Sequence, residues 1–148
     1  MFNFNFQYTY PEIERVTYDN GQRFYLDPVT NHKLPSVTTI LSATSENDFT
    51  QWENRIGITA ANQQRKIGTD IGSLVHDHLE KHILSENRIC GNNIIHVLAK
   101  NMAEVIISNG LNDFQEIWGT ETALYLPELF AGTTDVMGIY DGKTSIID

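Results

Sequence analysis

The chain has 148 residues, of which 41% are apolar and 20% are charged. This composition is that of an ordinary globular protein, large enough for one domain with a buried core. The formal net charge of −9 argues against a protein that holds nucleic acid through a broad basic surface. It leaves room for an enzyme that meets phosphate groups through metal ions held by carboxylates, because a bound cation inverts the local field.

We expect neither a membrane-spanning segment nor a signal peptide in this sequence. No apolar run approaches the ~20 residues of a membrane-spanning helix. The first residues, MFNFNFQYTYPEIE, lack the basic region and apolar core of a signal peptide. The single cysteine, Cys90, excludes an internal disulfide and fits a reducing compartment. We therefore expect no membrane partner and a cytoplasmic location.

The first part of the chain is expected to form short strands and turns. The stretch RVTYDNGQRFYLD, residues 15–27, predicts a β-hairpin, because apolar residues alternate on both sides of Asp19-Asn20-Gly21. The following stretch SVTTIL, residues 36–41, is compatible with a short helix or a strand, since periodicity cannot separate the two at this length.

The middle of the chain, residues 50–110, has helical periodicity. Trp52 and Ile56 begin one apolar stripe. A second stripe in IGSLVHDHLEKHIL consists of Ile71, Leu74, Val75, Leu79 and Ile83. A further helix is predicted from Asn93 to Ser108 and is ended by Asn109-Gly110. Its apolar residues are expected to face a core: Ile95, Leu98, Met102, Val105 and Ile106.

The last part of the chain is rich in β-branched and aromatic residues. It predicts three strands, at about residues 117–126, 130–140 and 144–148. Asp141-Gly142 is a strong signal for a two-residue hairpin turn. The predicted fold class is therefore α+β, with an N-terminal β/loop segment and helices followed by an antiparallel β-meander.

Two aspartates occupy matching positions on the last two predicted strands. If the Asp141-Gly142 turn pairs Tyr140 with Lys143, Asp135 falls directly opposite Asp148. Neighbouring strands lie about 4.8 Å apart, and carboxylates at that separation repel each other unless a cation lies between them. Such oxygen-rich sites suit Mg²⁺ or Mn²⁺. The spacing also fits two solvent-exposed aspartates, or a register shifted by one or two residues.

Three further groups are candidates for chemistry. His76 and Glu80 share one face of a predicted helix, because they are four residues apart. His78 and His82 also share a face, which would suit zinc, but no H-E-x-x-H pattern or third ligand accompanies them, and we expect both to be solvated. Glu121, on the strand before the hairpin, is either a third site carboxylate or an exposed residue of a half-buried strand.

Several short motifs, taken in order, resemble the PD-(D/E)xK nuclease superfamily and within it the RecB-type exonucleases. They are G-S-L-V-H at 72–76 with Glu80 four residues on, Glu121, A-G-T-T-D at 131–135 and I-I-D at 146–148. The stretch RFYLDPVTNHKLPSVTTIL, residues 23–41, is similar to the lead-in of phage exonucleases and of the mitochondrial genome maintenance exonuclease. Trp52 to Arg55 fits the same pattern. The resemblance covers roughly Arg23 to Asp148.

The resemblance implies a role for each matching residue. Asp135 corresponds to the metal-binding aspartate of a G-x-x-D motif, and Asp148 to the acidic residue of the D-x-K motif. Glu121 corresponds to a first-strand glutamate that helps to shape the site, and His76 to a helix histidine that ligates or supports the metal. The expected catalytic residues are therefore Asp135, Asp148 and Glu121. The expected ligands of Mg²⁺ or Mn²⁺ are His76, Asp135 and Asp148, while Glu80 is expected to brace the helix.

The resemblance also implies a function and a setting. The expected activity is metal-dependent hydrolysis of phosphodiester bonds, as in a DNA exonuclease that acts on ends or single strands. The expected fold is a partial restriction-endonuclease-like core, and the expected location is the cytoplasm of a bacterial or phage-infected cell. Exonuclease or endonuclease action, DNA or RNA as substrate, and oligomeric state all stay open at this point.

In the family pattern a lysine follows the last aspartate as D-x-K, and the sequence ends at Asp148. We therefore expect residues 1–148 to be a single, C-terminally truncated nuclease domain that cleaves nucleic acid poorly or not at all. Its parts would be a β/loop lead-in over residues 1–45, a helical part over 50–110 and a β-meander over 117–148.

Two other functions fit parts of the sequence. The first is an inactive, nuclease-derived module that binds nucleic acid. The second is an HD-type metal phosphohydrolase, suggested by the adjacent His76 and Asp77. That fold is all-helical and needs further His and Asp residues on other helices, so the β-rich end of the chain counts against it.

Overall fold

The computed structural model describes residues 2–5, 7–44 and 49–148. They form helices and two three-stranded sheets, which confirms the predicted α+β class. The chain divides into two compact units. The helical unit comprises Met1–Phe2 and Asn47–Phe114, and the sheet unit comprises Asn3–Glu46 and Gln115–Asp148. The N-terminal lead-in and the C-terminal meander therefore belong to the same unit.

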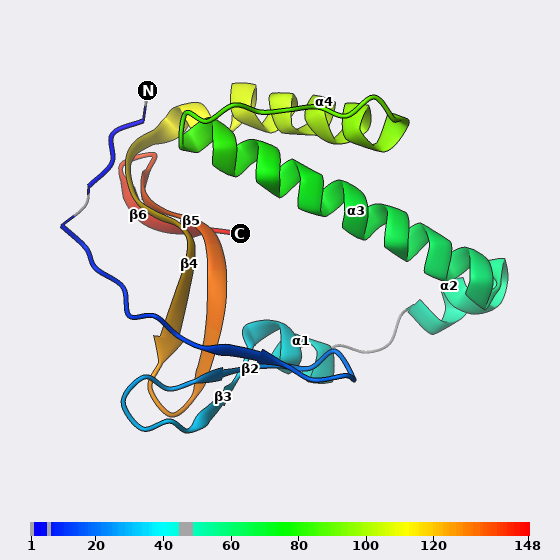
Figure 1. Ribbon diagram of the computed structural model, residues 1–148, viewed down its shortest axis with the longest axis horizontal. Helices are drawn as coiled ribbons and strands as arrows, with labels where there is room; N and C mark the ends of the chain where they lie inside the picture. The colour runs from blue at the N-terminus through cyan, green and yellow to red at the C-terminus, as the bar shows by residue number, and fades with distance from the viewer. Residues whose placement is uncertain (1, 6, 45–48) are drawn as a thin grey trace. The chain divides into compact units, whose positions relative to one another are not determined.

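The described residues of the helical unit form three α-helices and one turn of 3-10 helix (Figure 1). They are α2 (Phe49–Ile56), α3 (Ile58–Ile83), α4 (Ile94–Asn109) and η1 (Leu111–Asp113). Gly57, with φ of 85°, separates α2 from α3, in a backbone conformation that residues with a Cβ rarely adopt. The side chain of Asn93 caps α4 by accepting a hydrogen bond from the His96 N–H at 2.9 Å, and Gly110 follows its last turn. The ends of this helix are thus close to those that the sequence predicts.

Small residues bring α3 and α4 together. Val75 of α3 and Ala99 and Ala103 of α4 are buried in one cluster. Partly buried residues of the same two helices pack around it: Ile71, Leu74, Leu79 and Ile107. The apolar stripe predicted for α3 is therefore largely correct.

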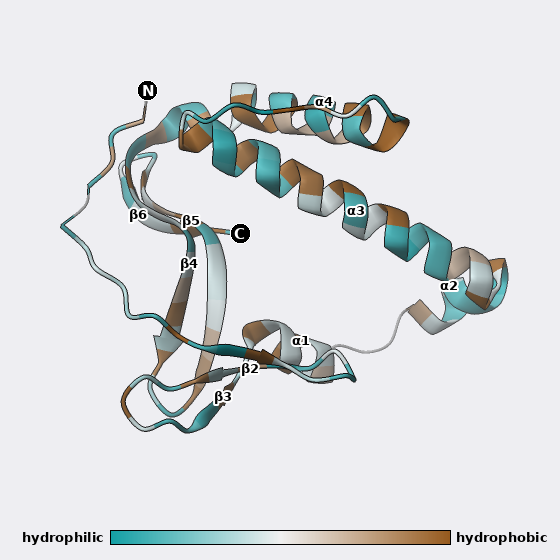
Figure 2. Ribbon diagram, in the orientation of Figure 1, coloured by the Kyte–Doolittle hydropathy of each residue, from teal (hydrophilic) through white to brown (hydrophobic). Residues whose placement is uncertain are grey.

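The prediction for the buried face of α4 is wrong. Leu98, Met102, Val105 and Ile106 are between 40% and 62% exposed, although the sequence places them in a core. Figure 2 shows hydrophobic segments along this helix. The physical reason is that alanines on another face allow a closer approach to α3 than bulky side chains would. The largest apolar residues of α4 are consequently left on its outer side.

The expectation that His78 and His82 are solvated is also wrong. His78 is buried, with 1% exposure, and His82 is half-buried with its ring 5.8 Å from that of Phe2 in an edge-to-face contact. His78 lies three residues after Val75, so the helical repeat turns it toward the same packed face.

Within the described residues, no helix has the length and apolar character that a membrane span requires.

The first sheet of the sheet unit is an N-terminal meander. Its strands are β1 (Arg15–Thr17), β2 (Arg23–Leu26) and β3 (Lys33–Pro35), paired antiparallel in that order. The predicted hairpin is confirmed, with Val16 opposite Phe24. The SVTTIL segment becomes helix α1 (Val37–Thr44), which the Ser36 hydroxyl caps by accepting from the Thr39 N–H at 3.0 Å.

The second sheet is the C-terminal meander, with strands in the order β4 (Phe114–Leu126), β5 (Phe130–Tyr140) and β6 (Lys143–Ile147). Tyr140 pairs with Lys143 across the Asp141-Gly142 turn, as predicted. Gly138 allows β4 to come close, because a Cβ at that position would lie 2.0 Å from the carbonyl oxygen of Glu116.

The two sheets share one small core. Tyr25 and Leu34 of the first sheet are buried with Ala131 of β5, and three partly buried residues pack against them: Ile13, Ala123 and Tyr125. The Tyr25 hydroxyl and the Thr133 hydroxyl are 2.9 Å apart and share a hydrogen bond. The N-terminal meander therefore holds β5 from one side, and β5 carries the candidate residue Asp135.

Candidate functional site

A pair of carboxylates lies on neighbouring strands of the second sheet. An oxygen of Glu121, on β4, lies within 4.8 Å of an oxygen of Asp135, on β5. Glu121 is exposed and Asp135 is half-buried. The sequence predicts both residues as site carboxylates, and the sheet brings them together although fourteen positions separate them. Two negative charges this close favour a cation between them.

The backbone at Glu121 has an unusual conformation. Its φ of 47° lies in the left-handed region, although the residue is not glycine and stands inside β4. Beside it, the Thr122 hydroxyl donates a hydrogen bond to the Thr120 carbonyl at 3.2 Å. A side-chain-bearing residue in a sparsely populated conformation costs of order 1–3 kcal/mol, and such residues concentrate at functional sites. The left-handed residue thus marks the strand position at which the carboxylate pair is formed.

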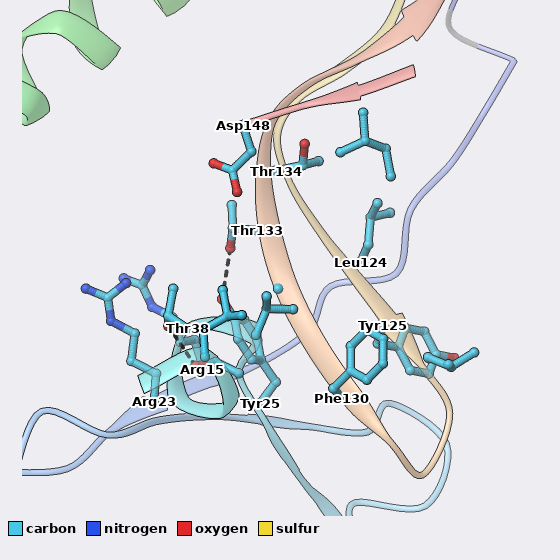
Figure 3. Close-up of a pocket in the computed structure, with 16 residues that line it drawn as sticks. Arg15, Arg23, Tyr25, Thr38, Leu124, Tyr125, Phe130, Thr133, Thr134 and Asp148 are labelled. Atoms are coloured by element: carbon cyan, nitrogen blue, oxygen red, sulfur yellow. Dashed lines mark hydrogen bonds between the residues drawn. The ribbon is translucent and has the colours of Figure 1, made fainter. Parts of the chain in front are cut away.

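The register of β5 and β6 places Asp148 opposite Asp135. Val136 pairs with Ile147, so the next step of the same ladder brings the two aspartates to matching positions. The Thr134 hydroxyl donates to the Ile147 carbonyl at 3.3 Å and fixes the end of this ladder. The carboxylate of Asp148 lines a pocket of the sheet unit together with Thr133 and Thr134 (Figure 3).

The remaining sequence-predicted residues belong to the helical unit. His76 is exposed on α3, and Glu80, one turn later, is half-buried. The Asp77 carboxylate is engaged by Lys81, whose ammonium nitrogen lies 2.7 Å from it. An HD-type phosphohydrolase would need Asp77 as a metal ligand, and its ion pair with Lys81 competes with that role.

His78 and His82, which follow His76 on α3, are buried and half-buried, respectively. Burial, and then the Arg88 guanidinium, lower the pKa of His78, so this imidazole is held in its neutral form. Burial also lowers the pKa of His82. Within the part of the chain that the structure describes, neither histidine joins a cluster of three metal-ligand side chains. The zinc alternative thus gains no third ligand here.

The sheet unit also contains a pocket of about 470 Å³ that the sequence analysis did not predict. Residues from β1, β2, α1, all three strands of the second sheet and the chain end line it. Two of them are arginines, Arg15 and Arg23, which flank the predicted hairpin. Their positions in the hairpin register are a signal that sequence reasoning had available, because the paired strands put them on one face of the sheet.

The chain matches no protein-family model, and neither a curated protein nor a solved structure matches it significantly. The geometry of the sheet unit is therefore the structural basis for assigning a function.

Proposed function

We propose that the chain carries the metal site of a metal-dependent nuclease of the PD-(D/E)xK type, an enzyme class that hydrolyses phosphodiester bonds in DNA. The observation that supports this function best is the carboxylate pair, Glu121 and Asp135, on adjacent strands. Support also comes from the left-handed backbone at Glu121 and from the ladder that carries Asp148 opposite Asp135. The order of these residues along the chain is the order of the nuclease motifs.

The carboxylate pair fits a small divalent cation. Two oxygens bound to one Mg²⁺ at about 2.1 Å lie at most about 4.2 Å apart. The Glu121 and Asp135 oxygens lie within 4.8 Å of each other, which is close to that geometry. All donors of the pair are carboxylate oxygens, the ligand type preferred by Mg²⁺ and Mn²⁺. A bound Mg²⁺ or Mn²⁺ would supply an activated water and neutralise charge on the scissile phosphate.

The residues of the chain have separate tasks in this proposal. Asp135 and Glu121 hold the cation from two strands, so the hydrogen-bonded sheet fixes the direction of both side chains. Asp148 contributes a further carboxylate from the end of β6. His76 is proposed as an additional ligand from the helical unit, on the basis of its place in the motif order.

Metal binding by single variants tests this function. Mn²⁺ titrations followed by electron paramagnetic resonance should show one site in the unaltered chain, and Asp135→Asn should weaken it at least tenfold, because one of few anionic ligands is lost. Asp141→Asn is the matched control: it makes the same charge change in the exposed turn of the same hairpin. Equal Mn²⁺ affinity in the two variants would remove Asp135 from the site.

The same samples separate a nuclease from a binding module. Labelled linear DNA is incubated with each protein and Mn²⁺ or with EDTA, and both retention and cleavage of the DNA are followed. Metal-dependent retention that is lost in Asp135→Asn and kept in Asp141→Asn supports a phosphodiester substrate. Cleavage that persists undiminished in Asp135→Asn would show that the catalytic groups lie elsewhere. Weaker Mn²⁺ binding by His76→Ala would support His76 as a metal ligand, and unchanged Mn²⁺ binding would exclude it from the site.

A further inference from the structure

The pocket of the sheet unit has a charged side and an apolar side. Its charged side carries Arg15 and Arg23, and its apolar side carries aromatic and aliphatic side chains (Figure 3). Its volume, about 470 Å³, lies within the range of small-molecule sites, which is roughly 300–1,000 Å³. The pocket is formed by residues other than the Glu121–Asp135 pair, so it is a separate feature of the same unit.

The hairpin register gathers the two arginines on one face. Arg15 pairs with Tyr25, and Arg23 lies two residues before Tyr25 on the same strand. Arg15 and Arg23 are therefore diagonal neighbours, about 7–8 Å apart at the backbone. Among the described residues, no carboxylate lies within ion-pair distance of either guanidinium. Two adjacent cations in a chain of net charge −9 create a local site for an anion.

Arg23 is held in place by the start of α1. Its N–H donates to the Thr39 hydroxyl at 3.2 Å, and its carbonyl accepts from that hydroxyl at 3.0 Å and from the Ser36 N–H at 3.1 Å. The hydroxyl of Thr38, next to these residues, also lines the pocket. The backbone that carries the guanidinium is thus fixed before any ligand arrives, which lowers the entropy cost of binding.

The apolar side remains open to solvent. Five of its side chains are between 39% and 64% exposed: Val37, Leu41, Leu126, Phe130 and Ile146. Phe130 and Tyr125 present aromatic rings on the side of the pocket away from the two guanidinium groups (Figure 3). A concave apolar wall that faces a cationic pair is typical of a site for a ligand with a planar ring at one end and an anion at the other.

We propose that this pocket binds a nucleoside monophosphate, either free or as the terminal residue of a strand. Arg15 and Arg23 take the phosphate through charge-assisted hydrogen bonds. The base packs against Phe130 and Tyr125, since every base has a flat face that stacks on an aromatic ring. The hydroxyl of Thr133 and the carboxylate of Asp148 face the space between and accept hydrogen bonds from sugar hydroxyl or base amino groups.

Equilibrium binding in EDTA tests the pocket without the metal site. The probes are deoxyadenosine monophosphate, deoxyadenosine and inorganic phosphate, each titrated by calorimetry. We expect the monophosphate to bind at least tenfold more tightly than either of its parts, because only it engages both sides of the pocket. A monophosphate that binds no better than inorganic phosphate would overturn the proposal, and would leave the metal-site proposal untouched.

Single-residue variants test the charged side and the apolar side of the pocket separately. Arg15→Gln and Arg23→Gln should each weaken the monophosphate roughly tenfold and leave deoxyadenosine unchanged, because a charge-assisted hydrogen bond is lost. Lys143→Gln is the matched control, since it removes the same charge from the same unit at an exposed residue outside the pocket. Phe130→Ala should weaken both deoxyadenosine and the monophosphate roughly tenfold. Equal effects of the arginine variants and of Lys143→Gln would refute a phosphate site, and circular dichroism checks that each variant is folded.

The source of the ligand is decided by competition. Short single strands carrying a 5′-phosphate, a 3′-phosphate or no terminal phosphate compete with labelled monophosphate in EDTA. Displacement by one phosphorylated strand only, sensitive to Arg15→Gln, identifies a strand end of that polarity. Displacement by free monophosphate but by none of the strands identifies a free nucleotide. Displacement by all strands equally, insensitive to Arg15→Gln, would contradict the pocket as the binding site.

Discussion

Replacing Glu121 by glycine and by alanine separates its backbone from its carboxylate. Both variants remove the charge beside Asp135, but only glycine removes the Cβ that makes a φ of 47° unfavourable. The left-handed conformation costs a residue with a Cβ about 1–2 kcal/mol, and glycine in a strand loses about 0.5–1 kcal/mol through its flexible unfolded state. The difference leaves Glu121→Gly more stable than Glu121→Ala by about 0.5–1 kcal/mol.

Urea unfolding at 25 °C, in EDTA and then in Mn²⁺, measures this difference. The control is Thr144, an exposed residue of β6 whose φ is not in the left-handed region. There the order reverses, and Thr144→Gly should be less stable than Thr144→Ala by about 0.5–1 kcal/mol. Mn²⁺ should stabilise both Thr144 variants and neither Glu121 variant, because ligand binding raises stability only where the site is intact.

Two results would refute this reasoning separately. If glycine is less stable than alanine at residue 121, as at residue 144, the backbone of Glu121 is not strained. If Mn²⁺ stabilises the Glu121 variants as much as the unaltered chain, the carboxylate is not a ligand. A strained residue that also holds metal would instead show the usual trade of stability for function at an active site.

Three further changes have defined outcomes. Saturating Mn²⁺ should raise the unfolding free energy of Asp141→Asn and not that of Asp135→Asn, because a cation stabilises the folded chain only where its carboxylate ligands remain; equal stabilisation of the two variants would contradict a site at Asp135. Because burial lowers the pKa of His78 from 6.5, the folded chain should be fully stabilised above that pH and lose stability as the pH falls below it. In His78→Leu the melting temperature should change less between pH 7.5 and pH 5.5 than it does in the unaltered chain. An equal change of melting temperature with pH in both proteins would show that another group titrates. Gly138→Ala should cost at least about 2 kcal/mol in urea unfolding, since the added Cβ meets the Glu116 carbonyl at 2.0 Å, and a neutral result would mean that the strands separate readily.

Local chemistry accounts for the parts of the fold that could be predicted. A two-residue Asp-Gly turn allows one register, so Asp141-Gly142 was enough to pair Tyr140 with Lys143 and to bring Asp135 opposite Asp148. Asn93 likewise marked the start of α4, because an amide side chain there accepts a backbone N–H that the helix itself leaves unpaired. In both cases the deciding interaction joins residues only a few positions apart.

Tertiary packing accounts for the predictions that failed. The apolar stripe of α4 predicted a buried face that includes Leu98 and Met102, yet Ala99 and Ala103 make the contact with α3. Hydrophobicity alone ranks leucine above alanine, whereas close helix packing can favour the smaller residue. His78 was misplaced for a related reason: its polarity suggested solvent, but its position on the helix turns it into the packed face.

The features that carry function depend on distant pairings, which explains why the sequence showed only some of them. The order of the motifs predicted Glu121 and Asp135 as site residues. The sequence around Glu121 does not indicate its left-handed backbone, because a glutamate in a strand normally has an extended conformation. The hairpin register could have indicated the arginine pair, but the pocket that the pair lines forms only when the first hairpin packs on β5.

Strand β5 connects the two proposed sites. Thr133 lines the pocket, and Asp135 joins the carboxylate pair two residues later on the same face of the strand. Residues at that spacing are about 6.6–6.8 Å apart, so a ligand seated in the pocket lies close to the carboxylate pair, and Asp148 is proposed to contribute to both sites. The experiments keep the two sites apart, because EDTA removes the cation and leaves the arginines charged. Loss of nucleotide binding in Arg15→Gln with intact Mn²⁺ binding, and the reverse in Asp135→Asn, would demonstrate two independent sites on one strand.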